Sequence, residues 1–103
     1  MNALIYARTS TIQQDIHTKV DTCSQWVKDN GGTVVKIYMD EGFSAHDTER
    51  PSLTQLIGEI SDHKNTVDTL VVIQVSDLFR NSDNLIEFVT GLDQLGIKLV
   101  RLN

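Results

Sequence analysis

Short apolar runs alternate along this chain with longer stretches in which apolar residues recur at helical spacing. The apolar runs predict four strands, at residues 3–8, 34–39, 70–75 and 97–102. The stretches between them predict helices at about residues 12–29, from Ser52 through Ile60, and at 84–95. In the first of these, Ile16, Val20, Cys23 and Val27 are spaced to form one apolar face.

Strands that alternate with helices predict an α/β fold, because parallel strands need crossover connections. We expect a three-layer sandwich with a mainly parallel central sheet and helices on both faces. The continuous apolar run 70–75 is typical of a strand that is buried on both sides. In such a sheet the carboxyl ends of the strands share one edge, so the polar segments after the first three strands should meet there.

The composition is that of a single globular domain, with 103 residues of which 40% are apolar and 22% are charged. No apolar run approaches the ~20 residues that a membrane span needs. The first residues lack the basic region of a signal peptide, so we expect a cytoplasmic protein that does not contact a membrane. The single cysteine, Cys23, excludes an internal disulfide and is predicted to be a buried thiol.

The net charge of −5 argues against a surface devoted to nucleic acid, although a local phosphate site remains compatible with it. Of the four arginines, three lie in the polar segments that follow strands or precede helices: Arg8, Arg50 and Arg80. The three histidines are scattered, and no carboxylates recur at ligand spacing, so no metal site is predicted. There is no glycine-rich phosphate loop and no dinucleotide motif, hence no cofactor is expected.

The first strand runs directly into Arg8 and Ser10, and two interpretations apply to this serine. Arginine holds phosphate through paired hydrogen bonds, and a serine hydroxyl beside it is a potential nucleophile for phosphoryl transfer. A serine ahead of a helix is also a common N-cap that accepts a backbone N–H.

The segment 40–51 is long for a connection and carries Ser44 and Arg50 ahead of Pro51. One interpretation makes Arg50 a second phosphate clamp, with Ser44 as a hydrogen-bond donor. The other is a solvated loop in which the arginine pairs weakly with its surroundings.

Together these segments resemble the catalytic domain of the serine recombinases, the resolvase–invertase family that includes large serine integrases and transposases of mobile elements. The opening block of that family is matched by Tyr6, Arg8, Ser10, Thr11 and Gln14. The second block is matched by residues 40–45 and 49–53, and the strand after its third helix by residues 96–100.

The resemblance implies a site-specific DNA recombinase that needs no metal or cofactor. Ser10 would attack a DNA phosphodiester and form a 5′-phosphoserine bond, and strand exchange and religation would reverse that step. Arg8, Arg50 and Arg80 would surround the scissile phosphate, while Gln14 and Ser44 would add hydrogen bonds. The implied partners are DNA and further copies of the chain, as a dimer and, during recombination, a tetramer.

The third block departs from the family, because an ungapped alignment places Asp77 where an arginine belongs. A gapped alignment gives Asp77 the family's aspartate position and deletes the arginine. A carboxylate there would repel a phosphodiester or pair with Arg80, which predicts impaired activity. Alternatively, Asp77 caps a helix that begins near Leu78.

The family's catalytic domain continues into a long dimerisation helix and a DNA-binding domain, so we expect residues 1–103 to be a truncated catalytic domain. The main alternative function is a catalytically impaired, recombinase-like module for regulation or interaction. An unrelated flavodoxin-like binding or receiver domain is disfavoured, because the sequence shows no phosphate-cradling loop and no acceptor aspartate after a central strand.

Overall fold

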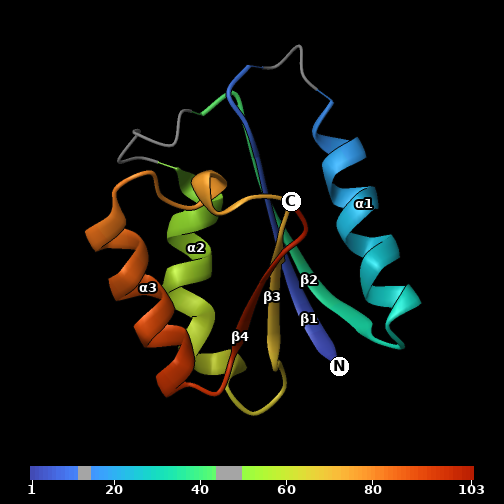
Figure 1. Cartoon of the computed structure of the whole chain (residues 1–103), viewed down its shortest axis with the longest axis vertical. Coiled ribbons are helices and arrows are strands. Elements are labelled where there is room, and N and C mark those ends of the chain that lie inside the picture. The colour runs from blue at the N-terminus through green and yellow to red at the C-terminus, as the bar shows by residue number, and fades with distance from the viewer. Residues whose placement is uncertain (12–14, 44–49) are drawn as a thin grey trace.

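The computed structural model describes residues 1–11, 15–43 and 50–103, and its centre is a parallel β-sheet (Figure 1). Four strands lie in the order β2-β1-β3-β4, and every pair of neighbours is parallel. Their bounds are Asn2–Thr9 for β1, Thr33–Glu41 for β2, Thr69–Val72 for β3 and Lys98–Arg101 for β4. The predicted strands are therefore all present, with ends that differ by one to three residues.

Helices cover both faces of this sheet, as predicted for a three-layer α/β sandwich (Figure 1). Helix α1, Ile16–Asp29, covers one face, whereas α2, Pro51–Glu59, and α3, Ser82–Gln94, cover the other. Two short 3-10 turns, η1 at Ile60–His63 and η2 at Val75–Asp77, complete the elements of the described ranges. None of the helices in those ranges is long and apolar enough to cross a membrane.

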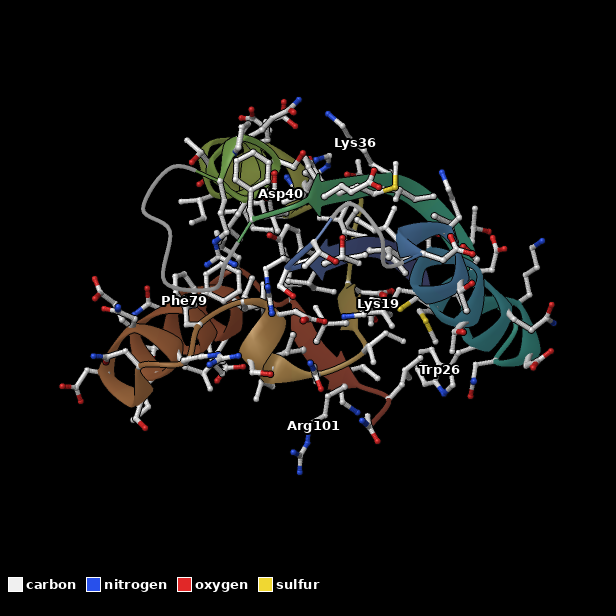
Figure 2. All side chains as sticks on the ribbon, turned by 90° about the horizontal axis from the view of Figure 1, so that it is seen from above. Lys19, Trp26, Lys36, Asp40, Phe79 and Arg101 are labelled. Atoms are coloured by element: carbon white, nitrogen blue, oxygen red, sulfur yellow. The ribbon has the colours of Figure 1, made fainter. Side chains whose placement is uncertain are left out.

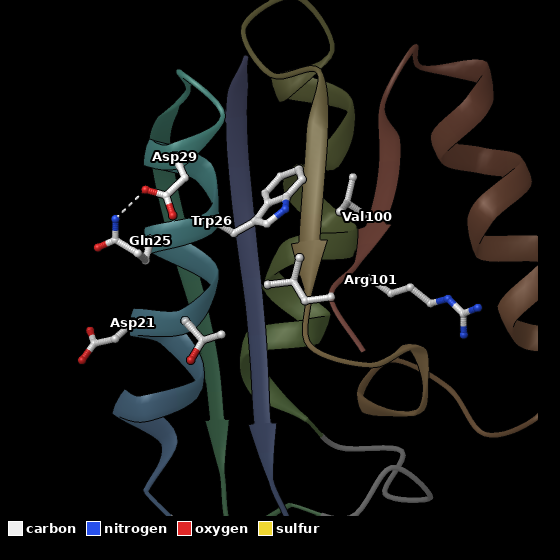
Figure 3. Close-up of a pocket in the computed structure, with 8 residues that line it drawn as sticks. Asp21, Gln25, Trp26, Asp29, Val100 and Arg101 are labelled. Atoms are coloured by element: carbon white, nitrogen blue, oxygen red, sulfur yellow. Dashed lines mark hydrogen bonds between the residues drawn. The ribbon is translucent and has the colours of Figure 1, made fainter.

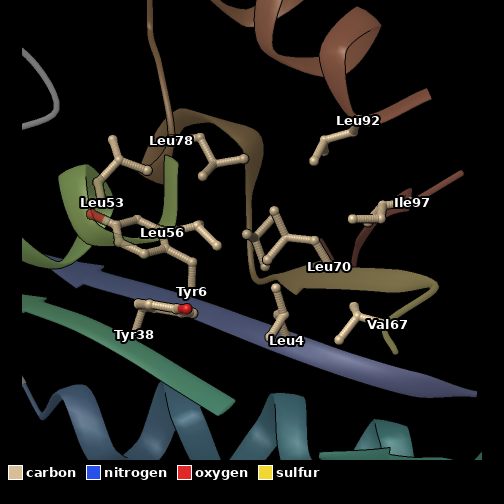
Figure 4. Packing of buried hydrophobic residues seen from close by; sticks show 11 residues of the cluster. Leu4, Tyr6, Tyr38, Leu53, Leu56, Val67, Leu70, Leu78, Leu92 and Ile97 are labelled. Atoms are coloured by element: carbon tan, nitrogen blue, oxygen red, sulfur yellow. The ribbon is translucent and has the colours of Figure 1, made fainter. Parts of the chain in front are cut away.

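The two faces of the sheet have separate hydrophobic cores. The larger core lies under α2 and α3 and includes Leu4, Tyr6, Tyr38, Leu53, Leu56, Leu70, Leu78 and Leu92 (Figure 4). The smaller core lies under α1, where Cys23 and Val27 pack on Ala3, Ile5 and Val71. Cys23 is fully buried, as the sequence predicted. The alternation of β1 side chains between the two cores holds this central strand rigidly in place.

Helix α1 begins later than the sequence pattern indicated, because Asp15 is its N-cap. The Asp15 side chain accepts a hydrogen bond from the backbone N–H of His17 at 3.0 Å and one from the Thr18 hydroxyl at 2.8 Å. The interpretation of Ser10 as the N-cap is therefore wrong. The helix ends as predicted, with Gly31 at a φ of 74° that favours glycine.

The chain leaves β3 earlier than predicted, since residues after Val72 turn into η2 instead of extending the strand. Asp77 lies in that turn and does not cap α3. The N-cap of α3 is Asn81, whose side chain accepts from the N–H groups of Asp83 and Asn84. The predicted capping role of Asp77 is therefore wrong, which leaves its carboxylate for other partners.

Helix α2 also begins differently from the prediction, because Ser52 lies inside its first turn and Pro51 opens it. The Ser52 hydroxyl donates to the carbonyl of Met39 at 2.5 Å instead of capping the helix. The capping carboxylate comes from Asp40 at the end of β2, which accepts from the N–H groups of Ser52 and Leu53 at 2.9 and 3.0 Å. A helix N-terminus stabilises such a carboxylate.

Candidate active site

The carboxyl ends of β1, β2 and β3 meet at one edge of the sheet, as predicted from the parallel topology. Arg8 of β1 lies beside Asp40 of β2 in the strand register. Asp77, from the turn after β3, contacts the Arg8 side chain. Figure 2 looks onto this edge and shows Asp40 and Lys19 near the strand ends. Residues from three separate parts of the sequence therefore form one polar cluster.

Arg8 is almost completely buried, at 5% exposure, and its guanidinium is only partly hydrogen-bonded. Its Nη1 donates to the carbonyl of Phe43 at 2.9 Å, and its Nη2 lies 3.4 Å from Oδ1 of Asp77. Its Nε has no hydrogen-bond partner in the described part of the chain. A buried arginine with an unpaired N–H retains capacity to bind an anion.

Arg50 is equally buried, at 3% exposure, so the solvated-loop interpretation of this residue is wrong. Its guanidinium donates to two consecutive backbone carbonyls, that of Asp77 at 2.6 Å and that of Leu78. It also lies over the ring of Phe79, 5.7 Å from the ring centre. Arg50 therefore fixes the turn that follows β3, and its own Nε has no partner among the described residues.

The carboxylate of Asp77 is fully buried, and among the described residues it has two cationic partners. The closer one is Lys19 of α1, whose Nζ lies 3.1 Å from Oδ2 and 3.3 Å from Oδ1. The other is Arg8 at 3.4 Å from Oδ1, and the side-chain amide of Gln74 lies at the same distance from that oxygen. The predicted local pair with Arg80 is not what the structure shows: in the described ranges the partners of the Asp77 carboxylate come from β1, α1 and the residue before η2.

Tyr6 and Asp40 form a buried hydrogen-bonded pair next to Arg50. The Tyr6 hydroxyl donates to Oδ2 of Asp40 at 2.8 Å and lies 3.5 Å from Nη1 of Arg50. Burial, together with the hydrogen bond and negative charge of Asp40, raises the pKa of Tyr6 well above its usual value. The phenol therefore stays protonated and serves as a fixed hydrogen-bond donor.

The remaining predicted site residues lie at the surface or outside the described residues. Ser10 is exposed and comes two residues after Arg8, directly beyond the end of β1. Arg80 is exposed on the segment between η2 and α3, outside the buried cluster of Arg8, Arg50 and Asp77. Gln14 and Ser44 lie outside the described residues.

Lys19 is the residue of this cluster that sequence reasoning missed. A signal was present, since Lys19 is three residues after Ile16 and four before Cys23, which places it on the buried face of α1. A lysine in an apolar stripe must reach either solvent or a buried anion. Here it reaches Asp77, which is 58 residues away in the sequence.

No group of three or more metal-ligating side chains occurs in residues 1–11, 15–43 and 50–103. Two surface grooves lie away from the polar cluster. An open groove of about 750 Å³ runs between α1 and β4, lined by residues that include Trp26, Asp29 and Arg101 (Figure 3). A second groove of about 620 Å³ lies between α2 and α3. Neither of these two grooves is lined by Ser10 or by the two buried arginines.

The sequence profile described as "Resolvase, N terminal domain" matches residues 3–103. No individually curated protein sequence matches the chain. Among solved structures, the N-terminal catalytic domain of TP901-1 integrase is 28% identical, with a TM-score of 0.91, covering 100% of this chain and 79% of that one.

Two more distant structures share the fold. The C-terminal catalytic domain of ISC1926 TnpA, an IS607-like serine recombinase, is 21% identical with a TM-score of 0.87, covering 100% of this chain and 68% of that one. A resolvase family site-specific recombinase from Streptococcus pneumoniae is 18% identical with a TM-score of 0.83, covering 99% and 72%.

Proposed function

Because the chain belongs to the family of resolvase N-terminal domains, we propose that it is a catalytic domain that cuts and rejoins DNA through Ser10. Its substrate is a DNA phosphodiester. The observation that carries this proposal is the position of Ser10, exposed at the end of β1 and two residues beyond the buried Arg8.

In the proposed reaction Oγ of Ser10 bonds to phosphorus and the bond from phosphorus to the 3′ oxygen breaks. The serine gives up its proton, and the 3′ oxygen takes one and leaves as a hydroxyl. The product is a 5′-phosphoserine ester, so the bond energy is kept for religation. The reverse attack by a 3′ hydroxyl restores both the DNA and the serine.

Arginines suit the charge that develops on the phosphate oxygens, because the guanidinium stays charged and presents several donors in one plane. Arg8 is the best-placed candidate, since it lies two residues before Ser10 at the end of β1. Its Nε, like that of Arg50, lacks a partner among the described residues. Arg50 holds the backbone of Asp77 and Leu78 in place, and its Nε is the donor without a partner among the described residues. Arg80 is exposed and can approach a phosphate from the solvent side. Gln14 and Ser44 remain proposed hydrogen-bond donors.

The partners in this proposal are DNA and further copies of the chain. The relatives with similar structures include an integrase and serine recombinases, which supports a role in DNA recombination by mobile elements. The net charge of −5 disfavours a broad nucleic-acid surface on these residues, so the proposal confines their contact with DNA to a local phosphate site.

A covalent-adduct experiment tests the proposal. The protein is incubated with fragmented genomic DNA, and complexes that survive denaturation are digested with nuclease and analysed by mass spectrometry. The proposal expects a nucleotide monophosphate on the peptide that contains Ser10, and none in the Ser10→Ala variant. An adduct that persists in Ser10→Ala, or an adduct on another residue, contradicts the assignment of Ser10.

The fully buried carboxylate of Asp77 favours a second candidate, a catalytically impaired module with a regulatory or interaction role. Its negative charge lies 3.4 Å from the guanidinium of Arg8 and competes with a phosphate for that cation. Asp77→Arg tests this candidate. An impaired domain should gain adduct formation, by ~10²–10³ if the missing arginine is a direct donor to the transition state. Equal adduct formation by the native chain would exclude impairment.

A further inference from the structure

The buried anion at Asp77 requires compensation, because an unpaired carboxylate out of water is strongly unfavourable. Two cations in the described part of the chain approach this carboxylate, and they are not equivalent. Lys19 lies within 3.1 and 3.3 Å of the two carboxylate oxygens, whereas Arg8 makes a single contact of 3.4 Å. By these distances Lys19 is the principal counter-ion of Asp77.

The geometry of Arg8 is consistent with this division. An arginine that neutralises a carboxylate by itself forms two parallel hydrogen bonds of about 2.7–2.9 Å. Arg8 instead gives Nη1 to the carbonyl of Phe43 and leaves Nε without a partner in the described ranges. The guanidinium of Arg8 is therefore held in place, while only one of its nitrogens contacts Asp77.

Lys19 is also fixed in position at the edge of the sheet. Its Nζ donates to the carbonyl of Arg8 at 2.8 Å, which ties α1 to the end of β1 two residues before Ser10. The Lys19 side chain is 27% exposed, so it lies between the buried carboxylate and the surface. One lysine thus links the anion, the arginine backbone and the surface.

We propose that Lys19 is a positioning residue that neutralises Asp77 and so keeps the guanidinium of Arg8 available for a DNA phosphate. This inference rests on the proposed function, since it assigns a role within the same site. Without Lys19, Arg8 would become the main counter-ion of a buried carboxylate and would turn toward it. A phosphate would then meet a neutralised pair instead of a cation.

Four variants separate this role from a general effect on folding. Lys19→Met removes the charge while keeping most of the side-chain length, and Lys19→Arg retains the charge. Asp77→Asn removes the anion, and the double variant removes both charges. Lys28→Met is the matched control, because Lys28 is an exposed lysine of the same helix.

The first measurement follows the guanidinium N–H signals of Arg8 by ¹H–¹⁵N NMR, assigned with Arg8→Lys, and needs no activity. In Lys19→Met, the Arg8 signals should shift and exchange more slowly with solvent, because the group is newly bonded to Asp77. In the double variant, which lacks both charges, the Arg8 signals should be the same as in Asp77→Asn. Unchanged Arg8 signals in Lys19→Met would overturn the inference.

The second measurement is the rate of adduct formation at saturating DNA, using the duplex recovered from the wild-type adduct. Lys19→Met should react about tenfold more slowly, a coupling within the range seen for residues in direct contact. Lys28→Met and Lys19→Arg should stay near the wild-type rate, and Lys19→Met should cost little in the Asp77→Asn background. An equal loss in both backgrounds would show that Lys19 acts independently of Asp77 and would overturn the inference.

The two proposals can fail separately. A wild-type chain that forms no adduct contradicts the proposed function, while the NMR measurement still decides whether Lys19 controls Arg8. If the wild-type chain forms an adduct and Lys19→Met forms it equally fast, the proposed function stands and the role of Lys19 is contradicted.

Discussion

Tyr6 and Asp40 are joined by a buried hydrogen bond of 2.8 Å between two neighbouring parallel strands. The same carboxylate accepts the N–H groups of Ser52 and Leu53 at the start of α2. Asp40 therefore connects β1, β2 and α2 directly below Arg50. This acidic side chain joins the first turn of the helix that follows Arg50 to the ends of two strands.

Asp40→Ala should destabilise the fold more than Tyr6→Phe. The alanine variant loses the helix cap and leaves a buried phenol without an acceptor, costing about 2–4 kcal/mol. The phenylalanine variant loses one hydrogen bond, about 1 kcal/mol, while the carboxylate keeps its two backbone donors. Urea unfolding followed by circular dichroism measures both. The double variant should cost less than the sum, and strict additivity would contradict the coupling.

Arg50→Lys should destabilise the protein although it keeps the positive charge. Lysine cannot donate to both the Asp77 and Leu78 carbonyls in the fixed geometry of a guanidinium, so we expect a loss of about 1–3 kcal/mol. Arg101→Lys is the control, because Arg101 is exposed on β4. Equal free energies of unfolding for the two variants would show that the carbonyl contacts of Arg50 contribute nothing.

Glu59 should make stability depend on pH in the acid range. Hydrogen bonds from Lys36, Tyr38 and Gln55 lower the pKa of Glu59 to about 2. In the unfolded chain a glutamate titrates near ~4.3. Because the folded pKa is the lower one, the contribution is present above the unfolded value and is lost as the pH falls toward 2.

The measurement compares wild type and Glu59→Gln by urea unfolding at pH 7 and pH 3. The stability advantage of the wild type should shrink at the lower pH. Glu87→Gln, which removes an exposed glutamate of α3, controls for the change in net charge. A wild-type advantage over Glu59→Gln that is the same at both pH values would contradict this prediction.

Cys23 should resist alkylation in the folded protein. Burial, with a further contribution from the negative charge of Asp77, raises the pKa of the thiol to about 11. Since the thiolate is the nucleophile and the side chain is fully buried, iodoacetamide should react slowly at pH 8. Mass spectrometry should show rapid labelling only after urea unfolding. Comparable rates in the folded and unfolded chains would contradict both the burial and the raised pKa.

Much of the fold was predictable because it depends on local patterns. The strand 2–9 follows from a continuous run of apolar residues, and the helix 16–29 follows from apolar residues spaced three or four positions apart. The boundaries at Asp15 and Val72 were missed, and so was the group that caps α2. The start of α2, for example, depends on the carboxylate of Asp40, which is 12 residues from Ser52 and belongs to another element.

The candidate site was predictable in part for the same reason. The parallel topology gathers the ends of β1, β2 and β3, so the approach of Arg8 to the segment around Asp77 followed from the sequence. Arg50 was identified, but its burial and its contacts with two carbonyls were not. A loop arginine gives no local sign of whether it faces solvent or a turn 27 residues away.

The sequence by itself determined the α/β class, the shared edge of the sheet and the residue types available for phosphate chemistry, because periodicity and strand order are local or topological properties. Only the tertiary structure decided that Lys19, and not Arg80, is the close partner of Asp77. Their separation of 58 residues is bridged by the packing of α1 on the sheet. The pairing of buried charges depends on distances of a few ångströms, and packing alone sets those distances.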